Sequence, residues 1–256
     1  MKVAVCGKGG CGKSTIVTIL ANELARQGKE VLIIDSDESN YGLHRHLGME
    51  NPKDFTGFFG GKQNVLNDMM LSNFTHQFFN GAWELKDIPE GFYTEKDSVK
   101  LMVSGKIHQA NEGCACAMNT VMKQFVANLR LREDQVAIMD LEAGIEHFGR
   151  GIDDEADVIL MVCDPSYESM QLAKQVKQLG DNIQKPVYYI LNKVLDGSEN
   201  IIKEAIEEED HILAVFPMKS DLLRAALEGK ALQADALDMK KVVEKISRWE
   251  MKIDYC

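Results

Sequence analysis

The sequence predicts a doubly wound α/β protein with a mostly parallel sheet of about seven or eight strands and helices on both faces. Short, nearly continuous apolar segments rich in Val, Ile and Leu alternate with segments of helical periodicity along the chain. Strands that are apolar on both faces are typical of a parallel sheet covered by helices on each side. The chain has 256 residues, enough for a large core, and we expect a single domain spanning 1–256.

The expected elements follow one another in a regular order. Strands are expected at 2–6, 31–35, 100–104, 136–140, 158–163, 187–191 and 212–216. Helices are expected at 14–27, 118–131, 167–179, 200–208, 221–228 and 238–249. The first helix carries an apolar stripe, and Gly28 stands where its C-terminal cap belongs.

Residues 51–98 interrupt this alternation. They contain seven of the ten phenylalanines together with Trp83. We expect a helical insertion that packs its aromatic side chains against the edge of the sheet. The alternative is a docking surface for a client protein, since aromatic residues are enriched in the cores of protein interfaces.

Composition narrows the classes of function. The net charge of −11 argues against a nucleic-acid partner, because phosphate backbones are bound by clustered Lys and Arg. No apolar run is long enough for a membrane helix, and no signal peptide precedes the first strand, so a cytoplasmic protein is expected. The six cysteines then indicate reduced thiols, metal ligands or apolar packing and not a disulfide framework.

A glycine-rich loop lies between the first expected strand and the first expected helix. A loop of this pattern in this position binds nucleotide phosphates through main-chain N–H groups and a helix N-terminus. We therefore expect ATP and Mg²⁺, with Lys13 at the β- and γ-phosphates and the Ser14 hydroxyl on Mg²⁺. The loop and the residues expected to bind nucleotide are Gly7, Lys8, Gly9, Gly10, Cys11, Gly12, Lys13, Ser14 and Thr15.

The second lysine of the loop, Lys8, directly follows the first glycine. This arrangement resembles the deviant Walker A signature of the MinD/ParA/nitrogenase-iron-protein ATPases. The resemblance implies a homodimer in which Lys8 crosses the interface to the partner's nucleotide, much as an arginine finger does. Hydrolysis would then require two subunits with ATP held between them.

Further strand ends match the same family. The resemblance implies that Asp37 orients the attacking water near Mg²⁺, that Asp140 holds the Mg²⁺ shell through water, and that the Gly144 N–H senses the γ-phosphate. Asn192 and Pro217 are expected on the adenine side. Carboxyl ends of parallel strands meet at one edge of a sheet, so these residues should converge on the loop.

Cys114 and Cys116 form a pair with one residue between them. Helical residues two apart point about 200° away from each other, so both thiols can bind one ion only outside a helix. The pair should lie in a turn at a helix N-terminus, which favours thiolate. Two such pairs across a twofold axis would supply four thiolates, suited to Zn²⁺, an iron–sulfur cluster or another thiophilic ion. Two idle cysteines or a redox pair are the alternatives.

The phosphate loop, the cysteine pair with Gly113, and the segment 144–147 together resemble the CooC-type accessory ATPases that insert nickel into carbon monoxide dehydrogenase. Close relatives of that family mature acetyl-CoA synthase. The resemblance implies a dimer that binds one Ni²⁺ or Zn²⁺ through Cys114 and Cys116 of both subunits. The expected partner is a client nickel enzyme, either carbon monoxide dehydrogenase or acetyl-CoA synthase.

Two other functions fit parts of the sequence. Four cysteines at a dimer interface could hold an iron–sulfur cluster, which would make the protein an electron-donating ATPase. A MinD/ParA-like positioning ATPase would instead use an amphipathic C-terminal helix at a membrane, and residues 240–253 mix lysines with apolar residues. The same pattern suits a final helix packed on the sheet, which we favour. His147, within the segment after Asp140, is expected to link nucleotide state to the dimer interface.

Overall fold

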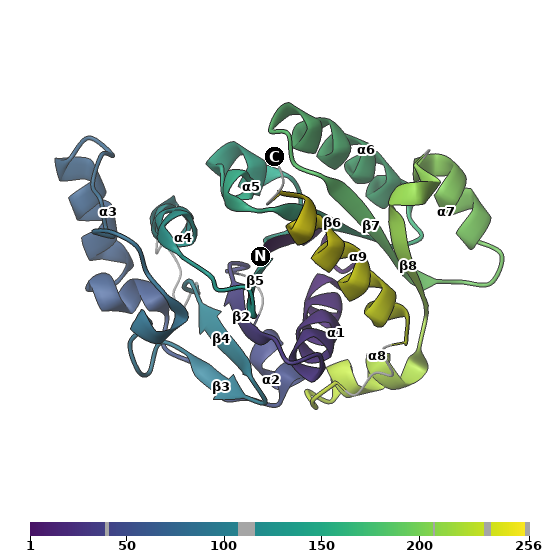
Figure 1. Ribbon diagram of the computed structural model, residues 1–256, viewed down its shortest axis with the longest axis horizontal. Helices are drawn as coiled ribbons and strands as arrows, with labels where there is room; N and C mark the ends of the chain where they lie inside the picture. The colour runs from purple at the N-terminus through teal and green to yellow at the C-terminus, as the bar shows by residue number, and fades with distance from the viewer. Residues whose placement is uncertain (39–40, 107–115, 207, 233–236, 254–256) are drawn as a thin grey trace.

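The computed structural model describes residues 1–38, 41–106, 116–206, 208–232 and 237–253. Its centre is one eight-stranded sheet with the order β3-β4-β2-β5-β1-β6-β7-β8 (Figure 1). The strands are β1 (Lys2–Gly7), β2 (Glu30–Asp35), β3 (Thr94–Lys96), β4 (Val99–Val103), β5 (Gln135–Asp140), β6 (Val158–Cys163), β7 (Val187–Val194) and β8 (Ile212–Pro217). All neighbouring strands pair in parallel except β3, which is antiparallel to β4. The predicted fold class is confirmed.

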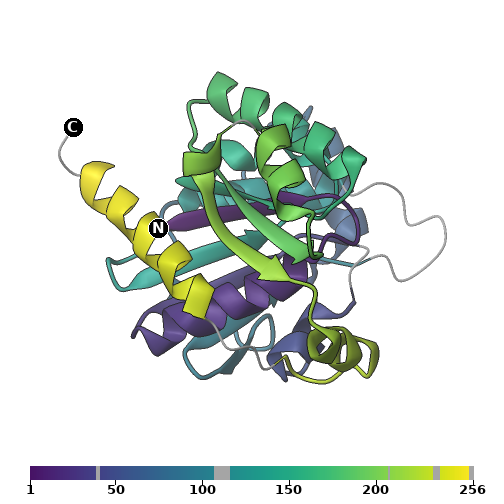
Figure 2. The ribbon, with the colours of Figure 1, turned by 90° about the vertical axis from the view of Figure 1, so that its right-hand side faces the viewer.

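Helices cover both faces of the sheet, as Figure 2 shows in a view from the β8 edge. The helices are α1 (Lys13–Arg26), α2 (Leu43–Leu47), α3 (Lys62–Leu71), α4 (Cys116–Asn128), α5 (Glu146–Arg150), α6 (Tyr167–Asn182), α7 (Glu199–Ile206), α8 (Ser220–Leu227) and α9 (Leu237–Ile253). Short 3-10 turns lie at Phe55–Phe59, Leu85–Asp87, Asp153–Glu155 and Glu209–His211.

The two faces of the sheet belong to two apolar cores. Along β2, Leu32 and Ile34 join the core shared with α4, α6 and α7, while Val31 and Ile33 join the core shared with α1, α2 and α9. Successive side chains of a strand point to opposite faces, so each strand contributes to both cores. This two-sided burial is why the strands are continuously apolar.

Every strand predicted from the apolar runs is present, and every predicted helix is present with its ends shifted by a few residues. The cap predicted at Gly28 is confirmed, since its φ is +83° and its N–H donates to Ala25 O at 3.0 Å. The sequence did not predict β3, α2 or α5, which are five residues or shorter, too short for periodicity to reveal them. α3 lies within the insertion that was expected to be helical, although its bounds were not predicted.

The insertion between β2 and β4 packs its aromatic residues against one another and against α4. Phe55 is fully buried and lies at ring-centroid distances of 5.3 Å from Phe125 and 5.8 Å from Phe59. The same cluster includes Phe58, Phe78, Phe79, Trp83 and Phe92. The aromatic residues have a packing role, as expected, but the ring contacts that the structure describes are with one another and with α4 and not with the edge of the sheet. The segment also contains β3 as well as helix. Phe74 stands apart, 68% exposed.

The last helix, α9, packs on the sheet beside α1 (Figure 1). Its apolar residues Met239, Val242, Val243 and Ile246 are buried. This is the arrangement expected of an ordinary final helix. Within the described residues, no helix has the length and apolar character needed to cross a membrane.

Candidate functional site

The predicted site residues converge at the carboxyl edge of the parallel strands. β2, β5 and β1 are neighbours, with Asp35 in register with Asp140 and Asp140 in register with Val5. The loop after β1 therefore lies beside the residues that follow β2 and β5. In an open α/β sheet this edge is where ligands bind.

The loop 7–14 is a tight turn that leads directly into α1. The Cys11 N–H donates to Lys8 O at 3.2 Å, and the Ile16 N–H donates to Gly12 O at 3.0 Å to begin the helix. Gly12 has a φ of +97°, and a Cβ there would overlap with the side-chain amide of Asn192. Only glycine suits this position. Cys11 is fully buried beneath the loop, so its side chain acts as a small packing group.

Lys13 and Ser14 lie at the N-terminus of α1, where their side chains already have partners within the site. The Lys13 ammonium is buried, with the residue 6% exposed, and donates to Gly7 O at 3.5 Å. The Ser14 hydroxyl donates to Asp140 Oδ2 at 2.7 Å. The Lys13 ammonium, the Ser14 hydroxyl and the Asp140 carboxylate therefore lie close together beside the loop.

Three aspartates surround this volume. Asp35, Asp37 and Asp140 are all buried, and burial raises the pKa of Asp140 to about 6, although Ser14 and Lys13 oppose the rise. Asp37 lies close enough to raise the pKa of Asp140 further. Burial likewise raises the pKa of Asp35. The repulsion between these buried carboxylates favours a positive charge nearby.

The oxygen donors at this point fit Mg²⁺, which prefers carboxylate, hydroxyl and water oxygens. Asp140 Oδ2 accepts the Ser14 hydroxyl, while Asp140 Oδ1 is buried and accepts no hydrogen bond from the described part of the chain. That oxygen can therefore accept a hydrogen bond from a water of the Mg²⁺ shell.

Sequence reasoning missed Asp35 and Lys106. The Lys106 ammonium donates to Asp35 Oδ2 at 2.7 Å and to Asp37 O at 2.5 Å, and the residue is 3% exposed. The signal was available in the sequence, since Lys106 follows the apolar strand β4 by three residues and Asp37 follows β2 by two. Charged residues just beyond the carboxyl ends of neighbouring strands should be considered together.

Lys8, the predicted trans residue, interacts within its own subunit. Its ammonium donates to Ser166 Oγ at 3.0 Å and lies 3.8 Å from an Asp164 carboxylate oxygen and 3.9 Å from one of Glu168. The side chain is 36% exposed. Lys8 is thus at the surface of the site, held at the N-terminal end of α6.

The segment after β5 is tied both to the phosphate loop and to α5. The Gly144 N–H donates to Gly7 O at 3.3 Å. His147, buried in α5, places Nδ1 2.8 Å from Asp153 Oδ2 and Nε2 3.0 Å from Gly144 O. The His147 ring therefore contacts the carbonyl of Gly144, the residue whose N–H was predicted to sense the γ-phosphate.

The two residues predicted on the adenine side, Asn192 and Pro217, lie close to each other. Together with Thr15, which was predicted with the phosphate loop, they line one small cavity beside α1. The Asn192 side-chain amide donates to Cys11 O at 2.9 Å, and the Lys193 ammonium donates to Gly10 O at 2.7 Å. Asn192 and Lys193 thus brace the phosphate loop from the β7 side, a contact that the sequence did not reveal.

The predicted metal ligands lie at the edge of the described structure. Cys116 is the first residue of α4, two residues before the expected helix start, while Cys114 lies outside the described residues. Cys6, Cys11 and Cys163 are buried free thiols, and burial raises the pKa of each. Among the described residues no three His, Cys, Asp or Glu side chains are grouped to hold a metal ion.

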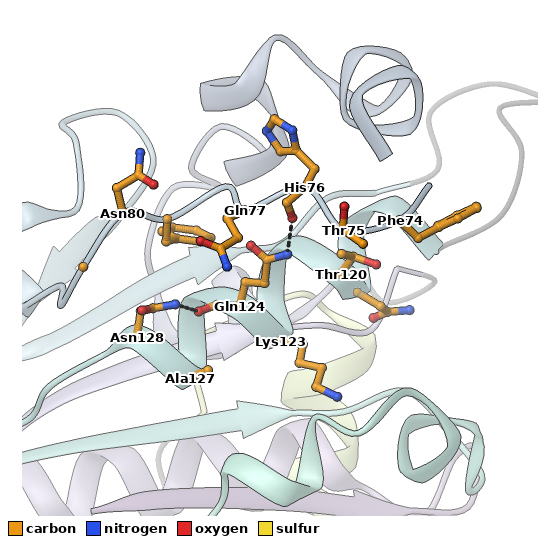
Figure 3. Close-up of a pocket in the computed structure, with 13 residues that line it drawn as sticks. Phe74, Thr75, His76, Gln77, Asn80, Thr120, Lys123, Gln124, Ala127 and Asn128 are labelled. Carbon is orange, nitrogen blue, oxygen red and sulfur yellow. Dashed lines mark hydrogen bonds between the residues drawn. The ribbon is translucent and has the colours of Figure 1, made fainter. Parts of the chain in front are cut away.

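A cavity of about 880 Å³ lies alongside α4. Figure 3 shows Gln124 between α4 and the loop 74–81, with its amide donating to His76 O at 2.8 Å. Amides and hydroxyls of Thr75, Gln77, Asn80, Asn119, Thr120 and Asn128 contribute to the lining, with Phe74 at one end.

Comparison with known proteins agrees with this geometry. Residues 2–232 match the family model of the CobQ/CobB/MinD/ParA nucleotide binding domain. An ATP-binding protein of Methanocaldococcus jannaschii is 42% identical over 250 residues, covering 97% of this chain and 100% of that protein. The carbon monoxide dehydrogenase accessory protein CooC of Rhodospirillum rubrum is 32% identical over 239 residues, covering 90% and 88%.

Among solved structures, the septum site-determining protein MinD of Pyrococcus horikoshii, complexed with Mg-ADP, has a similar fold. The TM-score is 0.65 at 16% identity, over 96% of this chain and 95% of that one. That likeness concerns the fold. The family model, the ATP-binding relative and the loop with its acidic neighbours make ATP and Mg²⁺ suitable ligands for this site. The chain belongs to the CobQ/CobB/MinD/ParA nucleotide-binding domain family and is a P-loop ATPase.

Proposed function

We propose that this protein is an ATP-dependent metallochaperone that carries nickel, or zinc in its place, and helps insert nickel into carbon monoxide dehydrogenase or acetyl-CoA synthase in the cytoplasm. The observation that carries the proposal is the 32% identity with a carbon monoxide dehydrogenase accessory protein over 239 residues. The cysteine pair supports it, because Cys116 begins α4, and a helix N-terminus favours the thiolate form that binds metal.

The ATPase chemistry follows from the site beside β1. Lys13 binds the β- and γ-phosphates, and the main chain of residues 9–15 surrounds them. Ser14 and Asp140 hold Mg²⁺, with Asp37 close by; the ion supplies positive charge where the phosphates are negative. Asp37 orients the attacking water, and the Gly144 N–H leaves Gly7 O to bind the γ-phosphate.

Two subunits are needed for both parts of the function. In the proposed homodimer, Lys8 leaves Ser166 of its own subunit and reaches the partner's nucleotide. Cys114 and Cys116 of each subunit together supply four thiolates to one ion, the number that a tetrahedral site requires. Because nucleotide closes the same interface that holds the metal, ATP binding tightens the metal site and hydrolysis releases it to the client enzyme.

Metal content after anaerobic purification tests the proposal. We expect about one Ni²⁺ or Zn²⁺ per dimer, since four thiolates bind one such ion. The double variant Cys114→Ala/Cys116→Ala should lose the metal, remain folded and still bind nucleotide. A matched control, Cys163→Ala/Cys256→Ala, removes two thiols outside the pair and should retain the metal.

Other outcomes of the metal analysis would point to a different function. Iron and sulfide lost with the cysteine pair would replace the metallochaperone with an iron–sulfur ATPase that donates electrons. The absence of any metal that depends on Cys114 and Cys116 would reject both, and would leave a MinD/ParA-like positioning ATPase. Size-exclusion chromatography of the same samples measures whether the metal and the dimer are lost together.

A further inference from the structure

Lys106 is a buried lysine whose ammonium contacts the last residue of β2 and the segment that follows it. It donates to the Asp35 carboxylate at 2.7 Å and to the Asp37 main-chain carbonyl at 2.5 Å. It also lies over the ring of Tyr41, 5.9 Å from the centroid. The Lys106 main-chain N–H is fixed separately, because it donates to Asp54 Oδ2 at 3.1 Å.

A lysine with only 3% of its surface exposed is uncommon, because burying an ammonium is unfavourable unless it is paired. The Asp35 carboxylate alone would neutralise the charge. The second bond, to the Asp37 carbonyl, adds no neutralisation but fixes the main chain of Asp37. The Asp37 N–H is fixed as well, since it donates to Asp35 Oδ1 at 3.2 Å. Lys106 and Asp35 thus fix the main chain of Asp37 at its carbonyl and at its N–H.

We propose that Lys106 is a positioning residue for ATP hydrolysis. By holding the Asp37 carbonyl, it fixes the direction of the Asp37 side chain, which carries the attacking water in the proposed function. The inference therefore rests on that role of Asp37. Lys106 reaches the site from the loop after β4, so hydrolysis depends on a strand and loop that carry none of the predicted nucleotide-binding residues.

The first test compares Lys106→Met with Lys100→Met. Lys100 is a matched control near the start of β4, whereas Lys106 lies in the loop after the end of that strand. Lys100 is also buried, 9% exposed, and is paired with Glu30 at 2.8 Å. We expect Lys106→Met to lower kcat by about 10²-fold with little change in the KM for ATP, because small displacements of a catalytic group have effects of that size. Lys100→Met should keep the kcat of the unchanged protein.

A second measurement needs no turnover. In the protein without nucleotide and Mg²⁺, amide hydrogen exchange at residues 35–38 should be faster in Lys106→Met than in Lys100→Met, because the main chain at Asp37 has lost a bond. Equal exchange in the two variants, or an unchanged kcat in Lys106→Met, would overturn the positioning role.

A third comparison separates two roles of Lys106, the positioning of Asp37 and the neutralisation of the Asp35 charge. It can also be made if Lys106→Met alone does not fold. Asp35→Asn/Lys106→Met removes both buried charges, so it is compared with Asp35→Asn alone. A further loss of kcat in the double variant supports the bond to the Asp37 carbonyl. Equal kcat values would mean that Lys106 only balances Asp35, which would reject the inference.

The variant Asp37→Asn distinguishes failure of the inference about Lys106 from failure of the proposed function. If Asp37→Asn retains full turnover, then the assignment of Asp37 is wrong, and the positioning role falls with it. If Asp37→Asn stops hydrolysis while Lys106→Met does not slow it, then the proposed function stands and only the inference about Lys106 fails.

Discussion

At the scale of single residues, the position of Lys8 is the most informative for the ATPase cycle. Its ammonium lies in contact range of Ser166, Asp164 and Glu168, all at the start of α6 in the same subunit. The Lys8 side chain is 36% exposed, and ion pairs in contact with solvent contribute only about 0–1 kcal/mol to stability. Lys8 can therefore leave them at small cost when a partner's phosphates are available.

We predict that Lys8→Ala binds ATP but hydrolyses it about 10³-fold more slowly, as expected when a charge supplied by a partner subunit is lost. Lys13→Ala should instead lose ATP binding, because Lys13 lies inside its own loop. Binding is measured with a fluorescent ATP analogue and turnover by phosphate release. Full turnover in Lys8→Ala would rule out the trans role.

The sequence predicted which residues would gather at the site but not how they contact one another. Ser14 and Asp140 were assigned to the same ion, and they are 2.7 Å apart. Asn192 was assigned to adenine, yet its amide also bonds to Cys11 O. Such contacts depend on side-chain direction and on the register of strands far apart in the sequence, which no local pattern contains.

At the scale of elements, the insertion between β2 and β4 has its own aromatic cluster. Phe55 lies at its centre, since its ring contacts those of Phe58, Phe59, Phe79, Trp83, Phe92 and Phe125. Because Phe125 belongs to α4, this cluster fixes the insertion to the helix that begins at Cys116. The insertion is thus part of the support for the proposed metal site.

We predict that Phe55→Ala lowers the free energy of unfolding by about 3–5 kcal/mol, because it leaves a cavity in a packed core. Phe74→Ala is the matched control in the same insertion. Phe74 is 68% exposed, so its replacement should change stability by no more than about 0.5 kcal/mol. Urea unfolding followed by tryptophan fluorescence measures both changes, and equal effects would contradict the central position of Phe55 in the aromatic cluster.

The elements themselves were predictable to different degrees. Long strands and helices were found because apolar burial on both sides of the sheet imposes a strong pattern. β3, with three residues and two of them exposed, carries no such pattern. α5 is only five residues long, and it forms where His147 and Asp153 meet, a contact that follows from tertiary structure.

At the scale of the whole molecule, the proposed dimer predicts that two inactive variants can restore each other. A Lys13→Ala subunit binds no ATP but still offers Lys8, and a Lys8→Ala subunit binds ATP but lacks that lysine. Mixing the two should give hydrolysis well above that of either alone, with at most one working site per mixed dimer. The rate is measured as Lys13→Ala is added to a fixed amount of Lys8→Ala. No gain at any ratio would mean that Lys8 acts within its own subunit.

The place of β1 in the sheet affects how the chain can fold during synthesis. In the described sheet, β1 (Lys2–Gly7) lies between β5 and β6 and pairs with no other strand. The first strand to be synthesised therefore cannot pair until β5, which ends at Asp140, and β6, which ends at Cys163, have been made. At synthesis rates of about 5–20 residues per second, the delay is roughly seven to thirty seconds. The phosphate loop is anchored to β1, so a nascent chain cannot bind ATP until most of it has left the ribosome. Nucleotide can therefore stabilise the nearly finished protein but cannot guide its early folding.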